Sequence, residues 1–266
     1  MRRANAIGQL GMLAVGLGIA AAMGAGSASA DSTAIDPAAI DTAAFDPSAL
    51  FTDPSLSIPG LNLAISVDGY PVFQSGTATA YAGPGDMSIA YGDGSDAVSG
   101  GTGDQAIGDY AFADGTDSEA FAGLGDFNSA SAIGTGSAAN AGAGNGDVAF
   151  ANGTDSIANA GGEPGVDTTL VAGNDSYAVA IGNNDFADAG TGVAGTTTAT
   201  GDIASVFGNS SSALAGMGDF NLAEVLGSGS EASAGTGSYD FAGVLGEMLT
   251  ATATGASNMF DFMPTL

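Results

Sequence analysis

The chain has 266 residues, 45 of them glycine, with no cysteine, histidine or tryptophan, and its 29 acidic and 2 basic residues give a net charge of −27 at pH 7. The two basic residues are Arg2 and Arg3, so the rest of the chain offers no cation to phosphate, which excludes nucleic acid and anionic membranes as partners. Disulfide bonds are excluded as well, and so are the thiol, imidazole and amine groups that most enzymes use as nucleophiles or bases, so we expect no enzyme.

Residues 1–30 have the three parts of a secretory signal peptide. Arg2 and Arg3 form a positive start, residues 10–23 form an apolar stretch, and Ala28-Ser29-Ala30 is a small-residue cleavage site. The stretch is too short and too rich in glycine and alanine for a membrane anchor, which needs about 20 strongly apolar residues. We therefore expect a secreted protein or one on the extracellular side of the cell envelope.

Two short segments separate this leader from the body of the chain. Residues 31–60 contain three Asp-Pro pairs between small apolar groups, which is typical of a linker or of one-turn helices. Residues 61–76, LNLAISVDGYPVFQSG, predict two strands around a turn at Asp68-Gly69. These strands would cap the N-terminal end of a repeat domain that covers residues 61–255.

The body of the chain repeats itself with a period of about 19 residues, a length of internal repeat that is typical of a stacked array. Residues 134–142 (GTGSAANAG) match residues 153–161 (GTDSIANAG) at seven of nine positions. The segment AGLGDFN at 122–128 returns as AGMGDFN at 215–221, close to five units later. The same unit is therefore copied along most of the chain.

Each unit alternates small and apolar residues in runs such as SASAIG, SYAVAIG and IASVFG, bounded by glycine. Alternation is the period of a β-strand, and frequent glycine disfavours helices. We therefore predict an all-β fold, a β-solenoid or flattened β-roll of about nine coils, each with two strands of about five residues. Its interior would hold mostly Ala with Ile, Val, Leu and Phe. The high charge and glycine content leave a disordered chain as the alternative.

The units SIAYGDGSDAVSG (88–100), SASAIGTGSAANAG (129–142) and SYAVAIGNNDFADAG (176–190) resemble the head repeats of trimeric autotransporter adhesins. The resemblance covers residues 76–255 and implies a left-handed β-roll. The period is longer than in that family, and neither a heptad stalk nor a C-terminal membrane barrel is found here, so trimerisation and anchoring are not implied. The glycine- and alanine-rich style with a signal peptide also resembles exported proteins of high-GC Gram-positive bacteria.

Acidic residues recur about once per unit, at slightly varying intervals. They are predicted to form a ladder in which neighbouring carboxylates lie about 4.8 Å apart. This ladder consists of Asp86, Asp104, Asp126, Asp147, Asp167, Asp185, Asp202, Asp219 and Asp240. A second, less complete set consists of Asp96, Asp117, Asp155, Asp175 and Glu231.

Carboxylates held this close in a buried corner would need a cation, so the ladder is a candidate Ca²⁺ site with corner carbonyl groups as further ligands. The alternative is that aspartate after glycine only favours turns and solubility. Paired carboxylates could also serve glycoside hydrolysis, but no pair stands outside the repeat register.

Residues 256–266, ASNMFDFMPTL, follow the last repeat and are apolar, which predicts a cap for the open end of the array, with an exposed docking peptide as the alternative. The sequence as a whole predicts an exported, non-enzymatic repeat protein with a structural, adhesive or spacer role at the cell surface. Cell-envelope components, cationic surfaces and copies of the chain itself are the partners that its charge permits. The alternative is a Ca²⁺-dependent binding module that folds outside the cell.

Overall fold

The computed structural model describes residues 59–100, 106–142, 144–161, 173–190, 199–216, 218–235 and 237–254, together with the main chain of 260–264. The signal peptide and nearly all of the linker that the sequence predicts lie outside these residues, as do Asp104 and Asp167. Within them the fold is all-β and no helix is present. The predicted β-solenoid is confirmed.

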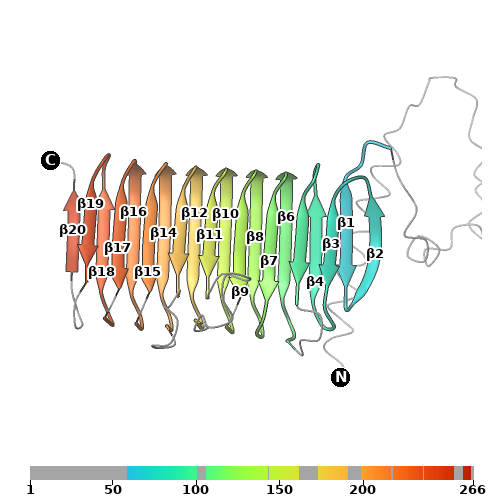
Figure 1. Cartoon of the computed structure of the whole chain (residues 1–266), viewed down its shortest axis with the longest axis horizontal. Coiled ribbons are helices and arrows are strands. Elements are labelled where there is room, and N and C mark those ends of the chain that lie inside the picture. The colour runs from blue at the N-terminus through green and yellow to red at the C-terminus, as the bar shows by residue number, and fades with distance from the viewer. Residues whose placement is uncertain are drawn as a thin grey trace, which may run out of the picture. The chain divides into compact units, whose positions relative to one another are not determined.

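Two sheets form the solenoid, and the chain passes from one to the other in each coil (Figure 1). Sheet A has eleven strands in the order β2 (Tyr70–Ser75), β1 (Leu63–Val67), β4 (Met87–Tyr91), β6 (Tyr110–Thr116), β8 (Ser129–Thr135), β10 (Val148–Thr154), β12 (Tyr177–Asn183), β14 (Ile203–Asn209), β16 (Leu222–Ser228), β18 (Phe241–Leu245) and β20 (Phe260–Pro264). Sheet B has nine strands in the order β19 (Thr250–Ala253), β17 (Glu231–Gly235), β15 (Ser212–Gly216), β13 (Phe186–Ala189), β11 (Ile157–Ala160), β9 (Ala138–Gly142), β7 (Glu119–Gly123), β5 (Asp96–Ser99) and β3 (Thr79–Ala82).

Each strand from β3 to β20 pairs in parallel with its copy in the neighbouring coil, so the main chain of one coil is satisfied by the next. The eight strand pairs from β4/β5 to β18/β19 are the complete coils, against about nine predicted. Most coils keep the predicted period, as from Ser129 to Val148, but the steps from Met87 to Tyr110, from Val148 to Tyr177 and from Tyr177 to Ile203 are longer. The extra residues fall between a sheet B strand and the following sheet A strand, and strand register is kept across them.

The N-terminal end is closed by the hairpin of β1 and β2, with its turn at Asp68 and Gly69. Both turn residues have left-handed backbone angles, φ 54° and 81°. Strand β1 runs antiparallel to β4, the first strand of the parallel stack in sheet A. At the other end, β20 extends sheet A by one strand beyond β18, within the residues for which the sequence predicts a cap.

Alanine fills the space between the sheets almost alone. Two inward positions per strand are alanine in most coils, as in Ala130 and Ala132 of β8, and these residues are fully buried. Valine replaces the second alanine of sheet A only at Val206, Val225 and Val244 among the described residues. The predicted interior of mostly Ala with Ile, Val, Leu and Phe is therefore confirmed for Ala and Val but wrong for Ile, Leu and Phe in the parallel stack, because two sheets spaced for small residues leave no room for these larger side chains. Those side chains stand on the outer faces.

A column of glycines stands close to the C-terminal ends of the sheet A strands and permits the tight passage to sheet B. A Cβ on Gly134 would overlap the carbonyl oxygen of Gly153, and one on Gly153 would overlap that of Gly182. Gly153 also has φ 147°, a conformation that other residues rarely adopt. Glycine is therefore required at this position both for its backbone angle and for the close approach of the next coil.

Candidate functional site

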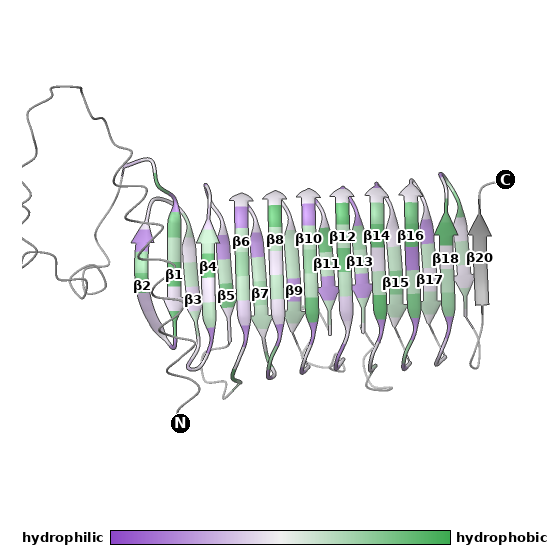
Figure 2. Ribbon diagram, turned by 180° about the vertical axis from the view of Figure 1, so that it is seen from behind, coloured by the Kyte–Doolittle hydropathy of each residue, from purple (hydrophilic) through white to green (hydrophobic). Residues whose placement is uncertain are grey.

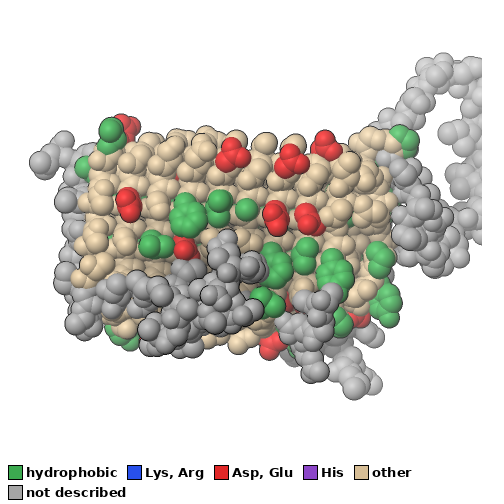
Figure 3. Space-filling model, in the orientation of Figure 1, with side chains coloured by type: hydrophobic (Ala, Val, Ile, Leu, Met, Phe, Trp, Pro, Cys, Tyr) green, Lys and Arg blue, Asp and Glu red, His purple; other side chains and the backbone are tan. Residues whose placement is uncertain are grey.

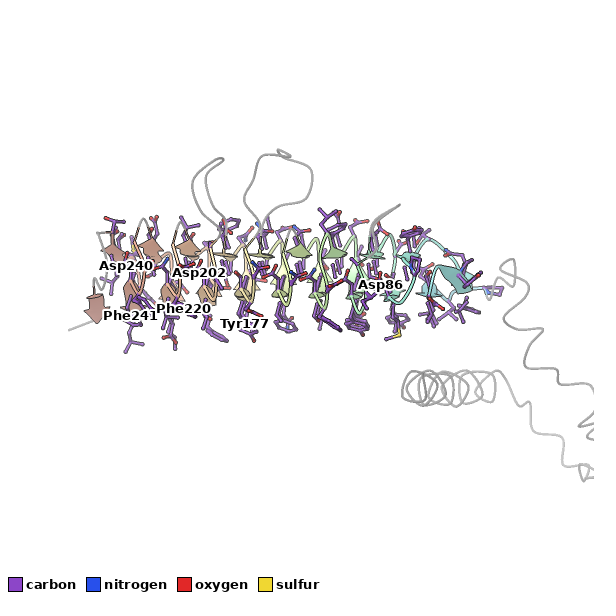
Figure 4. The ribbon with its side chains drawn as sticks, turned by 90° about the horizontal axis from the view of Figure 1, so that it is seen from below. Asp86, Tyr177, Asp202, Phe220, Asp240 and Phe241 are labelled. Atoms are coloured by element: carbon purple, nitrogen blue, oxygen red, sulfur yellow. The ribbon has the colours of Figure 1, made fainter. Side chains whose placement is uncertain are left out.

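A buried polar residue stands directly before the sheet A strand in all eight coils. We call this column the first-corner ladder. Its members are Asp86, Asp109, Asn128, Asp147, Ser176, Asp202, Asn221 and Asp240, none of them more than 3 % exposed. In Figure 4 Asp86, Asp202 and Asp240 lie at the level between the two sheets, whereas Tyr177 and Phe241 lie at the outer side.

The first-corner ladder binds the main chain of one coil to the side chain of the coil before it. A side-chain oxygen of each acceptor residue takes the backbone N–H of the next ladder residue, at 2.7–3.0 Å. The donors are the N–H groups of Asp109, Asn128, Asp147, Ser176, Asn221 and Asp240. These side chains replace the strand hydrogen bonds that the corner interrupts.

A second column stands directly before the sheet B strand. This second-corner ladder consists of Ser95, Ser118, Ser137, Ser156, Asp185, Ser211 and Ser230, all at most 3 % exposed. Each serine hydroxyl donates to the carbonyl oxygen of the glycine close to the C-terminal end of the sheet A strand of the next coil, at 2.6–2.9 Å. At both corners a buried side chain therefore forms a hydrogen bond to the main chain of the next coil, but the type of side chain differs.

The nine aspartates of the predicted ladder do not form one column. Four of them, Asp86, Asp147, Asp202 and Asp240, belong to the first-corner ladder. Asp126 and Asp219 stand two positions before the ladder residues Asn128 and Asn221 and are partly exposed. Asp185 belongs to the second-corner ladder, and Asp104 and Asp167 lie outside the described residues.

Four ladder residues, Asp109, Asn128, Ser176 and Asn221, were not included in the sequence prediction. Asp109 lies five residues after Asp104, which was counted in its place, and Asn128, Ser176 and Asn221 carry no charge. The signal that identifies them is their position immediately before a run of alternating residues. Neutral residues separate most of the ladder's carboxyl groups, and only Asp86 and Asp109 are adjacent.

The residues of the second predicted acidic set also occupy two different kinds of position. Asp117, Asp155 and Asp175 are exposed turn residues with φ 52–53°, each directly before a ladder residue. Asp96 and Glu231 begin β5 and β17, and Asp96 Oδ1 accepts the Thr79 hydroxyl at 2.6 Å. The left-handed angles fit aspartate, which adopts them more readily than most side chains do.

Burial has the largest influence on the titration of the ladder carboxyl groups. It raises the pKa of Asp147 to about 7; the N–H of Ser176 lowers this pKa and the carboxylate of Asp175 raises it. Burial also raises the pKa of Asp202 to about 7, against the backbone N–H of Asn221, with Asp219 adding to the rise. In the second corner, burial raises the pKa of Asp185 against the backbone groups of Ser211 and Gly208.

Among the described residues, no group of three or more acidic side chains is arranged to hold a metal ion. The Ca²⁺ ladder stays a prediction. It is tested by comparing melting and circular dichroism in millimolar Ca²⁺ and in EDTA, and unchanged curves would contradict it.

The outer face of sheet A carries large apolar side chains. Over β12, β14, β16 and β18 we call it the apolar face, which consists of Tyr177, Ile181, Ile203, Phe207, Leu222, Leu226, Phe241 and Leu245. Tyr177, Phe207, Leu226 and Leu245 are 41–47 % exposed, and Glu224 is the only charged residue of these four strands. Figure 2 shows green, apolar segments along these strands.

The outer face of sheet B is more polar over the same coils. Its strands β13, β15, β17 and β19 turn Asp188, Ser212, Glu231 and Thr250 outward. In Figure 3 acidic side chains stand singly on the visible surface and no Lys, Arg or His is seen there. The two faces of one solenoid therefore differ in chemistry.

Comparison with protein-family models, with curated proteins and with solved structures gives no match. In the part of the chain that the structure describes, no helix has the length and apolar character needed to cross a membrane. The class of the molecule is thus given by its own geometry, a two-sheet β-solenoid with an alanine interior and polar corner ladders.

Proposed function

We propose that the chain is an exported, non-enzymatic repeat protein that acts as a structural spacer with an adhesive surface on the outside of the cell. The apolar face is the observation that carries this proposal. Side chains such as Phe207 and Leu226 are more than 40 % exposed although an interior of alanine and valine is already complete without them. A contiguous exposed apolar surface on a soluble protein marks a contact surface.

The use of the corner residues supports a role without catalysis. The side-chain oxygens of Asp147 and Asp202 accept backbone N–H groups of the next coil, which holds the carboxyl groups in place as parts of the fold. Their recurrence in register is typical of a structural column, since a catalytic pair would depart from the repeat.

The charge of the chain limits the partner. With no cation after Arg3, the surface repels phosphate-bearing and other anionic partners. An uncharged apolar surface of the cell envelope, meeting Tyr177, Phe207 and Leu245, is compatible with both the charge and the apolar face.

The test combines cell fractionation with variants of the apolar face. Phe207→Thr with Leu226→Thr keeps side chains that favour strands but removes apolar area. We expect this double variant to be released into the medium and to bind less to alkyl-coated beads, while Leu214→Thr on sheet B behaves as the parent. Leu214 is 39 % exposed, which makes it a matched control. Equal retention of all three proteins in the envelope would contradict the adhesive role, and recovery of the parent inside the cell would contradict export.

A further inference from the structure

Asn128 and Asp147 occupy the same position in successive coils of the first-corner ladder. Asn128 Oδ1 accepts the N–H of Asp147 at 3.0 Å, and Asp147 Oδ1 accepts the N–H of Ser176 at 2.9 Å. One oxygen of each side chain therefore has the same task.

The other terminal atom of the asparagine is a donor. Asn128 Nδ2 donates to the carbonyl oxygen of Gly144 at 3.0 Å and to that of Gly123 at 3.4 Å. Asn221 repeats this arrangement four coils later, with Gly237 at 3.2 Å and Gly216 at 3.4 Å. At this position of the coil, two main-chain carbonyl groups thus converge on the second terminal atom of the ladder side chain.

In Asp147 that second atom is Oδ2, which is buried and has no hydrogen-bond partner. A Cβ on Gly161 would meet both this oxygen and the carbonyl oxygen of Gly142, and one on Gly144 would meet it and the carbonyl oxygen of Gly173. Oδ2 therefore stands among the carbonyl groups that correspond to those of Asn128. An ionised carboxylate there would place acceptor against acceptor away from water, whereas a protonated one can donate.

The charges around Asp147 also disfavour its ionised form. Its ladder neighbours Asn128 and Ser176 are uncharged, and among the described residues the carboxylate of Asp175 is the charge that acts on it. No Lys, Arg or His follows Arg3 in the chain. Burial, with a smaller contribution from Asp175, raises the pKa of Asp147 to about 7.

We propose that Asp147 is a protonated carboxyl group that donates Oδ2–H to a glycine carbonyl, and that it makes the junction between the β10/β11 coil and the β12/β13 coil sensitive to pH. Below neutral pH the side chain acts as Asn128 does. As the pH rises, loss of the proton leaves a buried carboxylate facing carbonyl oxygens, and the junction weakens. This device goes beyond the proposed adhesive role and does not depend on it.

The direction of the pH effect follows from proton binding. The folded chain keeps its proton on Asp147 up to a pH of about 7, whereas the unfolded chain loses it near the ordinary value of about 4. Between these values the folded state binds more protons, so stability falls as the pH rises and then levels off. For one such group the unfolding equilibrium constant rises by up to about tenfold per pH unit in this window.

The experiment compares denaturant unfolding of the full chain and of its Asp147→Asn variant between about pH 4 and pH 9. Asparagine supplies the donor at every pH, so we expect the variant to be more stable than the parent at the alkaline end. The two curves should converge at the acidic end, and the variant should lose the pH dependence of one proton.

The control is Asp155→Asn, which removes the same charge from an exposed turn. Asp155 has φ 52°, and Asn184 already occupies the equivalent position with φ 54°. Its curve should run parallel to that of the parent. If Asp147→Asn also runs parallel to the parent, or is less stable at the alkaline end, the proposal is wrong.

A spectroscopic measurement detects the proton itself. At about pH 6 exposed carboxyl groups with ordinary pKa values are ionised. The infrared difference between the parent and Asp147→Asn should then contain a carboxylic-acid carbonyl band, and absence of this band overturns the proposal. Stabilisation of the parent, but not of the variant, by Ca²⁺ at the alkaline end would show that Asp147 binds a cation in place of a proton.

Discussion

The two corners of the coil meet the same demand with different chemistry. Each corner interrupts the strand ladder, and each fills the gap with a buried side chain that bonds to the next coil. The second corner uses serine, whose hydroxyl donates to a glycine carbonyl in each of six coils. The first corner uses aspartate and asparagine, with serine at position 176 alone, and five of its eight residues carry a carboxyl group. A hydroxyl group is uncharged and can both donate and accept a hydrogen bond, whereas a carboxyl group can donate one only when it is protonated.

The difference between the two corners indicates where the stability of the solenoid can depend on pH. Apart from Asp185, the serine corner has no titrating group among the described coils, so its strength in the other coils should be independent of pH. The aspartate corner couples coil stacking to proton concentration at Asp147 and Asp202. Burial favours the neutral form of these two carboxyl groups, and no Lys, Arg or His follows Arg3 to pair with their ionised form.

The largest loss of stability is expected at a glycine next to the second corner, where there is no room for a side chain. In Gly153→Ala the new Cβ would overlap the carbonyl oxygen of Gly182, at a backbone angle of φ 147°. We expect a loss of about 3 kcal/mol or more in unfolding free energy, or no folded protein. Denaturant unfolding measures it.

Gly229→Ala is the matched control for this prediction. Gly229 has φ 62°, but its Cβ would find only Met248 Cγ, at 3.7 Å. Left-handed strain alone should cost about 1 kcal/mol. Equal losses in the two variants would show that the close approach of the coils at Gly153 contributes nothing.

The next effect compares one residue from each corner. Asn128→Ala leaves the N–H of Asp147 and the carbonyl of Gly144 without their side-chain partner, whereas Ser137→Ala removes one bond, to the carbonyl of Gly153. Each orphaned buried group costs about 1–3 kcal/mol. We expect Asn128→Ala to lose about twice as much stability as Ser137→Ala in the same unfolding measurement. A larger loss in Ser137→Ala would reverse the ranking of the two corners.

Much of this architecture could be predicted from the sequence, because strand alternation and glycine corners are local signals. The orientation of the corner residues could not. In GDFN at 125–128, the sequence prediction chose Asp126, but the left-handed residue Phe127 (φ 61°) turns the chain so that Asn128 is buried instead. Counting acidic residues at intervals of about one repeat cannot detect a shift of two positions.

Another ladder residue was missed because some coils are longer than the repeat period. Counting one repeat period on from Asp147 leads to Asp167, but Val148 pairs with Tyr177, and the ladder residue is Ser176. The position of the large apolar residues was missed for a related reason. Alternation shows that one face is buried but not which one, and here alanine takes the inside.

The smallest expected effect is a gain in stability when the one carboxyl group of the second corner is removed. Asp185 Oδ1 accepts the N–H of Ser211 at 3.0 Å, and burial raises the pKa of this carboxyl group. In Asp185→Ser the hydroxyl can accept that N–H and donate to Gly208, as Ser156 donates to Gly182 at 2.8 Å. Because a raised pKa lowers stability as the pH rises through it, the serine variant should gain stability over the parent in alkaline solution and match it in acid. Melting curves across pH measure this difference. A variant that melts below the parent at every pH would mean that the carboxylate, once ionised, is the better partner for this corner.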